Sequence, residues 1–334
     1  MGKIIGLGNA LIDVLVMLED DNLLTEMELC KGAMQLISAT KFQDLNKIVS
    51  SMDVCMSTGG SAANTIQALA CLNTPVGFLG KVGQDEFGRF FEQSFKEKNI
   101  DLHLIYDQTK ISGVASTFIS KDGERTFGTY LGAAADLVDS EILAEVLSQY
   151  EILYIEGYLV QNHSLIMKAI SMAKELGLKI CIDLASYNIV AEDLEFFTLL
   201  INDYADIVFA NEEEAHAFTN TTDPREALDR IAEVCEIAIV KVGSHGSYVK
   251  CKNAQYHIDP FQNHTVVDTT GAGDYYAAGF LYGYIHGYDL KVCGDLGALL
   301  SGHIIQVIGA NLPSDKWESV KLNLPKITAK SESF

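Results

Sequence analysis

Residues 268–274, Asp-Thr-Thr-Gly-Ala-Gly-Asp, place two glycines and a carboxylate directly before an apolar stretch that predicts a helix over residues 275–286. Gly271 and Gly273 permit tight backbone conformations, so that successive N–H groups can point at one cluster of oxygens. The dipole of the following helix favours an anion at the same place. Asp274 would then lie beside a bound phosphate and could accept a proton from an attacking hydroxyl. A glycine turn in which the Asp stabilises the helix N-terminus explains the spacing equally well.

Two further groups of residues follow predicted strands. Gly59 and Gly60 lie at a strand-to-helix turn, and Asn64 lies one turn into the helix, where its amide can reach a ligand above the glycines. Asn211 and Glu214 are three residues apart after another strand and can face the same side. Oxygen ligands there would suit Mg²⁺ held largely through water and phosphates. A plain turn with a helix cap and a solvated acidic first turn are the corresponding structural interpretations.

The segment 241–246, Lys-Val-Gly-Ser-His-Gly, ends a further predicted strand. Its glycines, Gly243 and Gly246, permit the close approach of a flat or phosphorylated ligand beside Lys241, and a hairpin turn would explain the same pair. Ligands of α/β sheets collect beyond the carboxyl ends of the strands. We therefore expect the four groups of residues to form one site.

The elements that would position these residues alternate along the chain between strand-like and helix-like apolar patterns. Such alternation predicts an α/β fold with a mostly parallel sheet covered by helices on both faces. The predicted strands are residues 3–8, 55–58, 76–80, 152–156, 178–183, 207–210 and 237–242.

Three stretches break the alternation, at residues 13–18, 32–37 and 112–129. They are strand-like, have no helices to cover them, and include Asp122-Gly123, which is typical of a hairpin. We interpret them as a small antiparallel sheet that forms a lid over the site; an ordinary extension of the main sheet is the alternative. The predicted domains are a core of residues 1–12, 40–110 and 130–325, a lid of residues 13–39 and 111–129, and a frayed tail of residues 326–334.

The composition excludes several classes of protein. The 334 residues include 45 acidic and 24 basic side chains, for a net charge of -21, and 48% are hydrophobic. This apolar fraction is typical of a globular protein, and the acidity argues against nucleic-acid partners, which bind clustered Lys and Arg. Seven scattered cysteines indicate a reducing compartment. No run approaches the ~20 apolar residues of a membrane span, so we expect a cytoplasmic protein without membrane partners.

Two segments only partly match nucleotide-binding motifs. Residues 6–11 begin like a dinucleotide fingerprint but lack its third glycine and continue as a strand, which leaves an NAD-dependent oxidoreductase as a remote alternative. Residues 83–90 have the glycine spacing of a P-loop without its Lys and its Ser or Thr. Taken alone, the second segment is a helix start.

From Ile4 to about Pro313, the chain resembles the ribokinase (PfkB) family of sugar and nucleoside kinases. The resemblance implies a three-layer ribokinase-like core, a β lid, and ATP with Mg²⁺ as cofactors. Its last motif is the most specific. The motifs that carry it, in chain order, are Gly59-Gly60 with Asn64, residues 80–88, Asn211-x-x-Glu214, Gly243-x-x-Gly246 and the 268–274 segment.

The resemblance also implies roles for individual residues. Asp274 would be the base that activates the acceptor hydroxyl, and the backbone of Gly271, Ala272 and Gly273 would form the anion hole for the phosphoryl group. The residues that would hold the hydroxyls of the acceptor are Asp13, Gly59, Gly60 and Asn64. Those that would bind ATP and its Mg²⁺ are Asn211, Glu214, Lys241, Gly243 and Gly246. Asp268 and backbone carbonyls near Gly309 would surround a monovalent cation such as K⁺.

The acceptor is predicted from segments similar to those of adenosine kinase-like members of the family, namely residues 8–13, 122–127 and 132–135. In those members an Arg at the position of Arg125 reaches the phosphates on closure; an exposed strand residue is the alternative. We therefore expect transfer to a primary hydroxyl of a ribonucleoside, with adenosine ahead of the free sugars of ribokinase- or fructokinase-like enzymes. A non-catalytic sugar-binding protein is a remote alternative. A free edge of the lid sheet could pair with a second copy in a homodimer.

Overall fold

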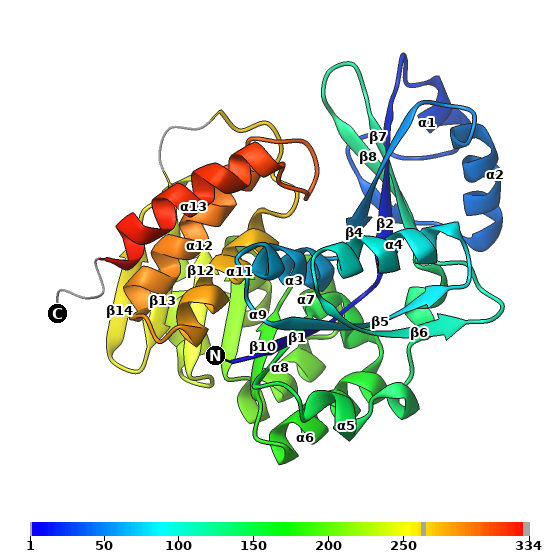
Figure 1. Ribbon diagram of the computed structural model, residues 1–334. Helices are drawn as coiled ribbons and strands as arrows, with labels where there is room; N and C mark the ends of the chain where they lie inside the picture. The colour runs from blue at the N-terminus through cyan, green and yellow to red at the C-terminus, as the bar shows by residue number, and fades with distance from the viewer. Residues whose placement is uncertain (1, 262–264, 330–334) are drawn as a thin grey trace.

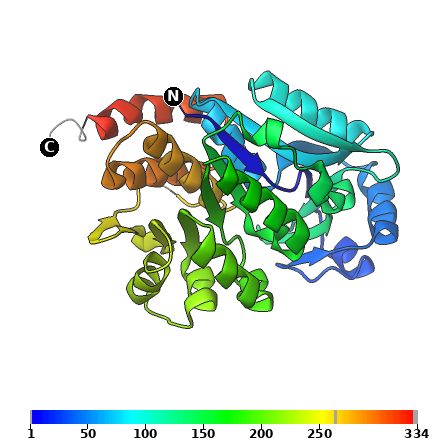
Figure 2. The same ribbon diagram turned by 90° about the horizontal axis from the view of Figure 1, so that it is seen from below.

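The computed structural model describes residues 2–261 and 265–329, and its centre is a nine-stranded sheet with the order β14-β13-β12-β11-β10-β9-β1-β5-β6 (Figure 1). The pairings from β12 to β6 are parallel, and only the β12–β13 and β13–β14 pairings are antiparallel. The yellow β13–β14 hairpin and the cyan β6 lie at opposite edges (Figure 2). The bounds are β1 Ile4–Leu7, β5 Val76–Gly83, β6 Asp101–Asp107, β9 Ile152–Glu156, β10 Lys179–Asp183, β11 Ile207–Asn211, β12 Ile237–Lys241, β13 Ser247–Cys251 and β14 Ala254–Ile258.

Helices cover both faces of this sheet, which confirms the predicted α/β class. Successive residues of a strand point to opposite faces; accordingly Ile152 and Tyr154 of β9 belong to one apolar core, and Leu153 and Ile155 to the other. The first core includes α3 Ser61–Cys71, α4 Glu86–Glu97, α11 Ala272–Ile285, α12 Leu290–Ile304 and α13 Ser314–Thr328. The second includes α5 Ala144–Leu147, α6 His163–Glu175, α7 Tyr187–Glu192, α8 Leu194–Asp203, α9 Glu212–Thr219 and α10 Pro224–Ala232. The 3₁₀ turns are η1 Gly132–Asp136, η2 Asp139–Glu141, η3 Gly157–Gln161 and η4 Gly243–His245.

A second, five-stranded sheet with the order β3-β8-β7-β2-β4 projects from the core at the upper right of Figure 1. Its β2–β4 and β7–β8 pairings are antiparallel and its β2–β7 and β3–β8 pairings parallel. The hairpin predicted at Asp122-Gly123 is confirmed, with Gly123 at φ +86°. The bounds are β2 Leu11–Met17, β3 Met34–Leu36, β4 Val54–Gly59, β7 Gly113–Ile119 and β8 Arg125–Tyr130, with the helices α1 Asn22–Glu26 and α2 Ala39–Val49.

The boundary between core and lid differs from the prediction. β4 was expected in the main sheet, but it forms an edge of the smaller one, because a short apolar run does not reveal its pairing partner. A helix also packs against the smaller sheet, which was predicted to have no helices covering it. Phe42 of α2 is buried against it and stacks on Tyr130 of β8 with ring centroids 5.1 Å apart.

The chain is still helical at residues 326–328, where the frayed tail was predicted to begin. Helix α13 continues to Thr328, past Pro325, because Ile327 is buried in the first core. Residues 330–334 lie outside the described part of the chain. Among the described helices, none combines the length and the apolar character that crossing a membrane requires.

Candidate active site

The N-termini of α3 and α11 meet at the carboxylate of Asp274. Ser61 Oγ donates to Asp274 Oδ1 over 2.7 Å, and Asn64 Nδ2 donates to Oδ2 over 2.9 Å. Burial raises the pKa of Asp274 to about 6, and the two hydrogen bonds act in the opposite direction because they stabilise the ionised form. The motifs at residues 59–64 and 268–274, far apart in the sequence, thus form one centre, as predicted.

The predicted anion hole is the first turn of α11. Gly271 caps the helix with φ +76°, a left-handed conformation that favours glycine. The N–H groups of Gly271 and Gly273 have no acceptor among the described residues, so both are available to an anion. The N–H of Ala272 already donates to the carbonyl of Thr269 over 3.1 Å. Two of the three predicted residues therefore offer free donors here.

Lys241, at the end of β12, supplies a positive charge beside this turn. A Cβ at Gly273 would lie 3.0 Å from Lys241 Nζ, so the glycine allows the ammonium group to approach. Burial alone would lower the pKa of Lys241, but the nearby carboxylates of Asp183 and Glu214 outweigh it and raise that pKa. Lys241 Nζ lies 3.3 Å from Asp183 Oδ2. The lysine is thus held charged in the acidic surroundings of the site.

Asn211 and Glu214 form hydrogen bonds with each other at the start of α9. Asn211 Oδ1 accepts from the Glu214 N–H, while Glu214 accepts from the N–H and from Nδ2 of Asn211, all within 2.8 Å. This is a capping box. Glu214 is buried rather than solvated, and burial raises its pKa to about 7. Among the described residues, no three Asp, Glu, His or Cys side chains are grouped so that they could hold a metal ion together.

Gly243 lies near the start and Gly246 at the end of the turn between β12 and β13, so the hairpin interpretation is confirmed. Gly246 has φ +87°, and a Cβ there would lie 1.9 Å from the carbonyl oxygen of Ile258. Both glycines also line a cavity of about 600 Å³ together with Asn211, Glu214, Lys241 and the 269–274 turn. The predicted ATP-binding residues therefore lie together around one cavity.

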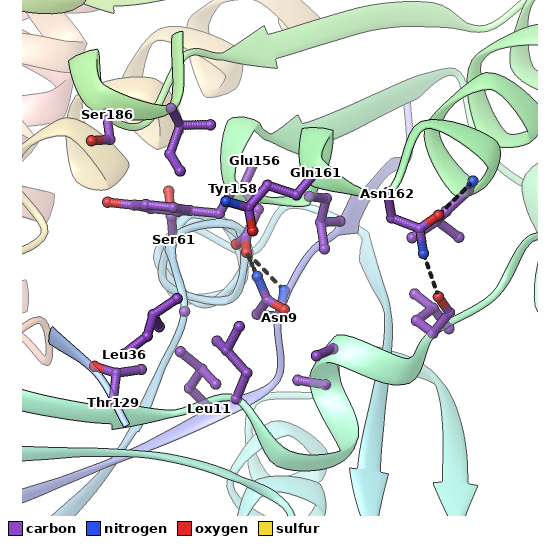
Figure 3. A pocket seen from close by; sticks show the side chains of 18 of the residues that line it. Asn9, Leu11, Leu36, Ser61, Thr129, Glu156, Tyr158, Gln161, Asn162 and Ser186 are labelled. Atoms are coloured by element: carbon purple, nitrogen blue, oxygen red, sulfur yellow. Dashed lines mark hydrogen bonds between the residues drawn. The ribbon is translucent and has the colours of Figure 1, made fainter. Parts of the chain in front are cut away.

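A second cavity, of about 700 Å³, opens on the other side of Ser61, which lines both. Leu36 and Thr129 of the smaller sheet line it from one side, and Tyr158 and Ser186 line it from the other (Figure 3). The remaining lining residues are Asn9, Leu11, Met34, Gly60, Leu131, Ala134, Ala135, Leu137, Glu156, Leu159, Gln161, Asn162, His163, Ser164, Leu165, Asn188 and Ile189. Asp274 is bonded to Ser61 at the junction of the two cavities.

Asp13 of β2 and Gly59 of the neighbouring strand β4 lie close together, although the register pairs Asp13 with Ser57 and Gly59 with Leu11. A Cβ at Gly59 would lie 2.4 Å from Asp13 Oδ1, so only glycine leaves room for the carboxylate. The pKa of Asp13 is raised to about 7, mainly by burial, while Arg125 lowers it and Asp274 raises it further. Both charged groups thus act on Asp13, as expected for a residue near the reacting centre.

Two carboxylates of the site were not predicted from the sequence. Asp183 ends β10 and lines the cavity of about 600 Å³. Glu156 ends β9, is buried, and accepts from the N–H and Nδ2 of Asn9 and from the N–H of Ala62, over 2.6–2.9 Å. Burial raises the pKa of Glu156 to about 7. Both lie at the carboxyl ends of predicted strands, which was the available signal.

Arg125 bridges the smaller sheet and the core. Its Nη1 lies 2.7 Å from Asp268 Oδ2 and donates to Thr270 Oγ1 over 2.9 Å. The side chain is only 14% exposed, so the alternative of an exposed strand residue is wrong. The smaller sheet is therefore joined to the 268–274 segment.

Comparison with known proteins agrees with this geometry, because residues 30–317 match the description "pfkB family carbohydrate kinase". The chain belongs to this family. Kinases of the pfkB family use ATP, generally with Mg²⁺, so the protein is a phosphotransferase acting on sugars or nucleosides. The dehydrogenase alternative is wrong, and residues 8–11 indeed lead into strand β2 instead of a helix.

Several relatives in the family resemble the chain over most of its length. A probable sugar kinase from Rhizobium etli CFN 42 has a TM-score of 0.86 and 32% identity, with 96% of this chain and 98% of that chain covered. Adenosine kinase from Sinorhizobium meliloti has a TM-score of 0.85 and 32% identity, covering 96% and 99%. The 5-dehydro-2-deoxygluconokinase of Lacticaseibacillus casei is 31% identical over 268 residues, 76% of this chain and 82% of that protein.

Proposed function

We propose that this kinase transfers the γ-phosphoryl group of ATP to a primary hydroxyl of a ribonucleoside, with adenosine as the favoured acceptor. The observation that carries the proposal is the cavity of about 700 Å³ beside Ser61, whose walls are largely aliphatic. Large, mostly apolar cavities with a few polar groups suit ligands that present flat apolar faces. A purine would contact Leu11, Leu36 and Leu137, and the ribose would lie toward Ser61.

The charge of the cavity disfavours a sugar acid, the acceptor that the name of the Lacticaseibacillus casei relative indicates. No Lys or Arg is among the described residues that line it, and the lining includes the carboxylic side chain of Glu156. A buried acceptor carboxylate would need a cation or several hydrogen-bond donors. A free neutral sugar is the second candidate, but it would leave much of the aliphatic wall without a partner.

The residues at the junction of the two cavities account for the transfer step. Asp274, oriented by Ser61 and Asn64, accepts the proton of the acceptor hydroxyl. Asn64 Oδ1 is buried without a hydrogen-bond partner among the described residues, which suits it to accept from another hydroxyl of the acceptor. The N–H groups of Gly271 and Gly273, with Lys241, face the charge of the phosphoryl group. Positioning and charge stabilisation of this kind are the main requirements of phosphoryl transfer.

Mg²⁺ fits the neighbouring oxygens of Glu214 and Asp183, which line the cavity of about 600 Å³. Because Glu214 already accepts from Asn211, it would hold the ion through water, in the manner usual for Mg²⁺ with nucleotides. When bound, the ion would neutralise phosphate charge.

Steady-state ADP release tests the proposal with adenosine, guanosine, ribose, fructose and 5-dehydro-2-deoxygluconate as acceptors. We expect kcat/KM for adenosine to exceed that for each sugar and for the sugar acid by about 100-fold or more, since only the nucleoside buries a base. A higher kcat/KM for a sugar or for the sugar acid would refute the nucleoside assignment.

A variant of the cavity wall makes the same test sharper. Leu36→Ser removes aliphatic surface from the proposed base site and should raise KM for adenosine about tenfold with little change in kcat. Leu199→Ser, on the exposed surface of α8, is the matched control and should leave both constants unchanged. Equal effects of the two variants would contradict the placement of the base.

A further inference from the structure

The carboxylate of Asp268 has an unusually complete set of partners. Its Oδ1 accepts from the N–H of Thr270 over 3.1 Å and from Thr270 Oγ1 over 2.8 Å. Its Oδ2 accepts from the N–H of Gly309 over 2.6 Å and lies 2.7 Å from Arg125 Nη1. The Asp268 side chain is 6% exposed, so these protein groups replace water around it.

These contacts do not fit the monovalent cation that the family resemblance implies at Asp268. A K⁺ ion would need free oxygen lone pairs, whereas both Asp268 oxygens already accept from N–H or O–H groups. The guanidinium of Arg125 also places a positive charge at Oδ2, and a second cation there would be repelled. Arg125, from the smaller sheet, already supplies the positive charge that a K⁺ ion would bring to Asp268.

We infer that Arg125 replaces the monovalent cation in this enzyme, so that phosphoryl transfer does not depend on K⁺. Thr270 links Arg125 to the anion hole. Its Oγ1 accepts from Arg125 and donates to Asp268, and the next residue in the chain is Gly271 of the anion hole. Arg125 therefore holds the anion hole in place when the smaller sheet is closed. An arginine is suited to this role because its planar guanidinium can donate to a carboxylate and to a hydroxyl at the same time.

Arg125 has a second donor group, Nη2, besides the Nη1 group that contacts Asp268 and Thr270. Its Nη2 is buried and has no hydrogen-bond partner among the described residues. A buried unpaired donor is costly unless a ligand satisfies it, and the phosphates of ATP are the acceptors expected at this end of the site. The inference rests on the kinase activity, but not on which acceptor is used.

Two measurements on the wild-type enzyme test the inference. ADP release is compared in tetramethylammonium chloride and in potassium chloride at equal ionic strength, and we expect rates within about twofold of each other. The melting temperature of the free protein should likewise be the same in both salts. Stimulation by K⁺ of about tenfold or more, or stabilisation specific to K⁺, would overturn the inference. The melting experiment needs no acceptor, so a wrong acceptor assignment cannot imitate its result.

Arg125→Ala supplies the complementary result. Removing the guanidinium frees Asp268 Oδ2, so this variant should lose activity in tetramethylammonium, regain part of it in K⁺, and melt at a higher temperature in K⁺. Arg225→Ala, on the exposed surface of α10, should behave as the wild type. Arg125→Gln is the second variant in case Arg125→Ala does not fold. The absence of any K⁺ response in the variant that folds would contradict a shared position for the two cations.

Discussion

Asp274 combines burial with two hydrogen bonds, and the balance sets the pH at which it can act as a base. Its pKa of about 6 leaves it ionised at neutral pH. Protonation removes the ability to accept a proton, so kcat/KM should fall as the pH drops below about 6. A pH–rate profile from pH 5 to 8.5 measures this midpoint. An activity independent of pH over that range would contradict the assignment.

Ser61→Ala separates the titration of Asp274 from that of ATP. The Ser61 hydroxyl stabilises the ionised carboxylate, so its removal should move the midpoint to higher pH. The phosphates of ATP titrate at the same pH with either enzyme. A midpoint that does not move would show that another group controls the profile.

At the scale of the elements, the start of α3 packs closely against the connection between β1 and β2. Gly60 has φ +98°, and a Cβ there would lie 2.1 Å from the carbonyl oxygen of Asn9. Gly60→Ala should therefore lower the free energy of unfolding by about 3 kcal/mol and raise KM for the acceptor. Chemical denaturation and steady-state kinetics measure the two effects.

Gly123→Ala is the matched control at the tip of the β7–β8 hairpin. Gly123 also has a positive φ, +86°, but open space surrounds its Cβ position. Only conformational strain remains, so we expect a loss of about 1 kcal/mol and unchanged kinetics. Similar losses in both variants would mean that the contact with Asn9 is unimportant.

The elements also show which parts of the site a sequence can reveal. The glycines and Asp274 form a contiguous motif, so their place together at the start of α11 could be predicted from the sequence. Asp183 and Glu156 are single carboxylates at strand ends. They could not be assigned to the site from the sequence, because the residues around them are distant in sequence and are brought together only by the sheet. β4 could not be assigned to its sheet for a related reason, because edge and central strands share short apolar runs.

At the scale of the whole molecule, the net charge of -21 includes four carboxylates that burial holds at raised pKa values. These pKa values are about 7 for Asp13, Glu156 and Glu214 and about 6 for Asp274. The folded state therefore binds protons more tightly than the unfolded chain, and stability should fall as the pH rises from about 4.5 to 7. Melting curves of the free protein should show a lower midpoint at pH 8 than at pH 5.5. The opposite trend would contradict these assignments.

Glu156→Gln tests the origin of that trend. The substitution removes one titrating group, so the change in melting temperature between the two pH values should become smaller. Glu318→Gln is the control, because the Glu318 side chain is 73% exposed and should not alter the trend. Equal slopes in both variants would assign the pH dependence to the surface charge as a whole.

Phosphoryl transfer by Asp274→Asn tests the catalytic assignment most directly. The amide keeps the size of the carboxylate but cannot accept the hydroxyl proton, so kcat with adenosine should fall by about 10²–10⁴-fold. Binding of ATP and adenosine, measured by calorimetry, and the melting temperature should stay close to those of the wild type. Asp315→Asn, in the first turn of α13, should retain full activity. Turnover by Asp274→Asn at the wild-type rate would contradict the role of Asp274 as the base.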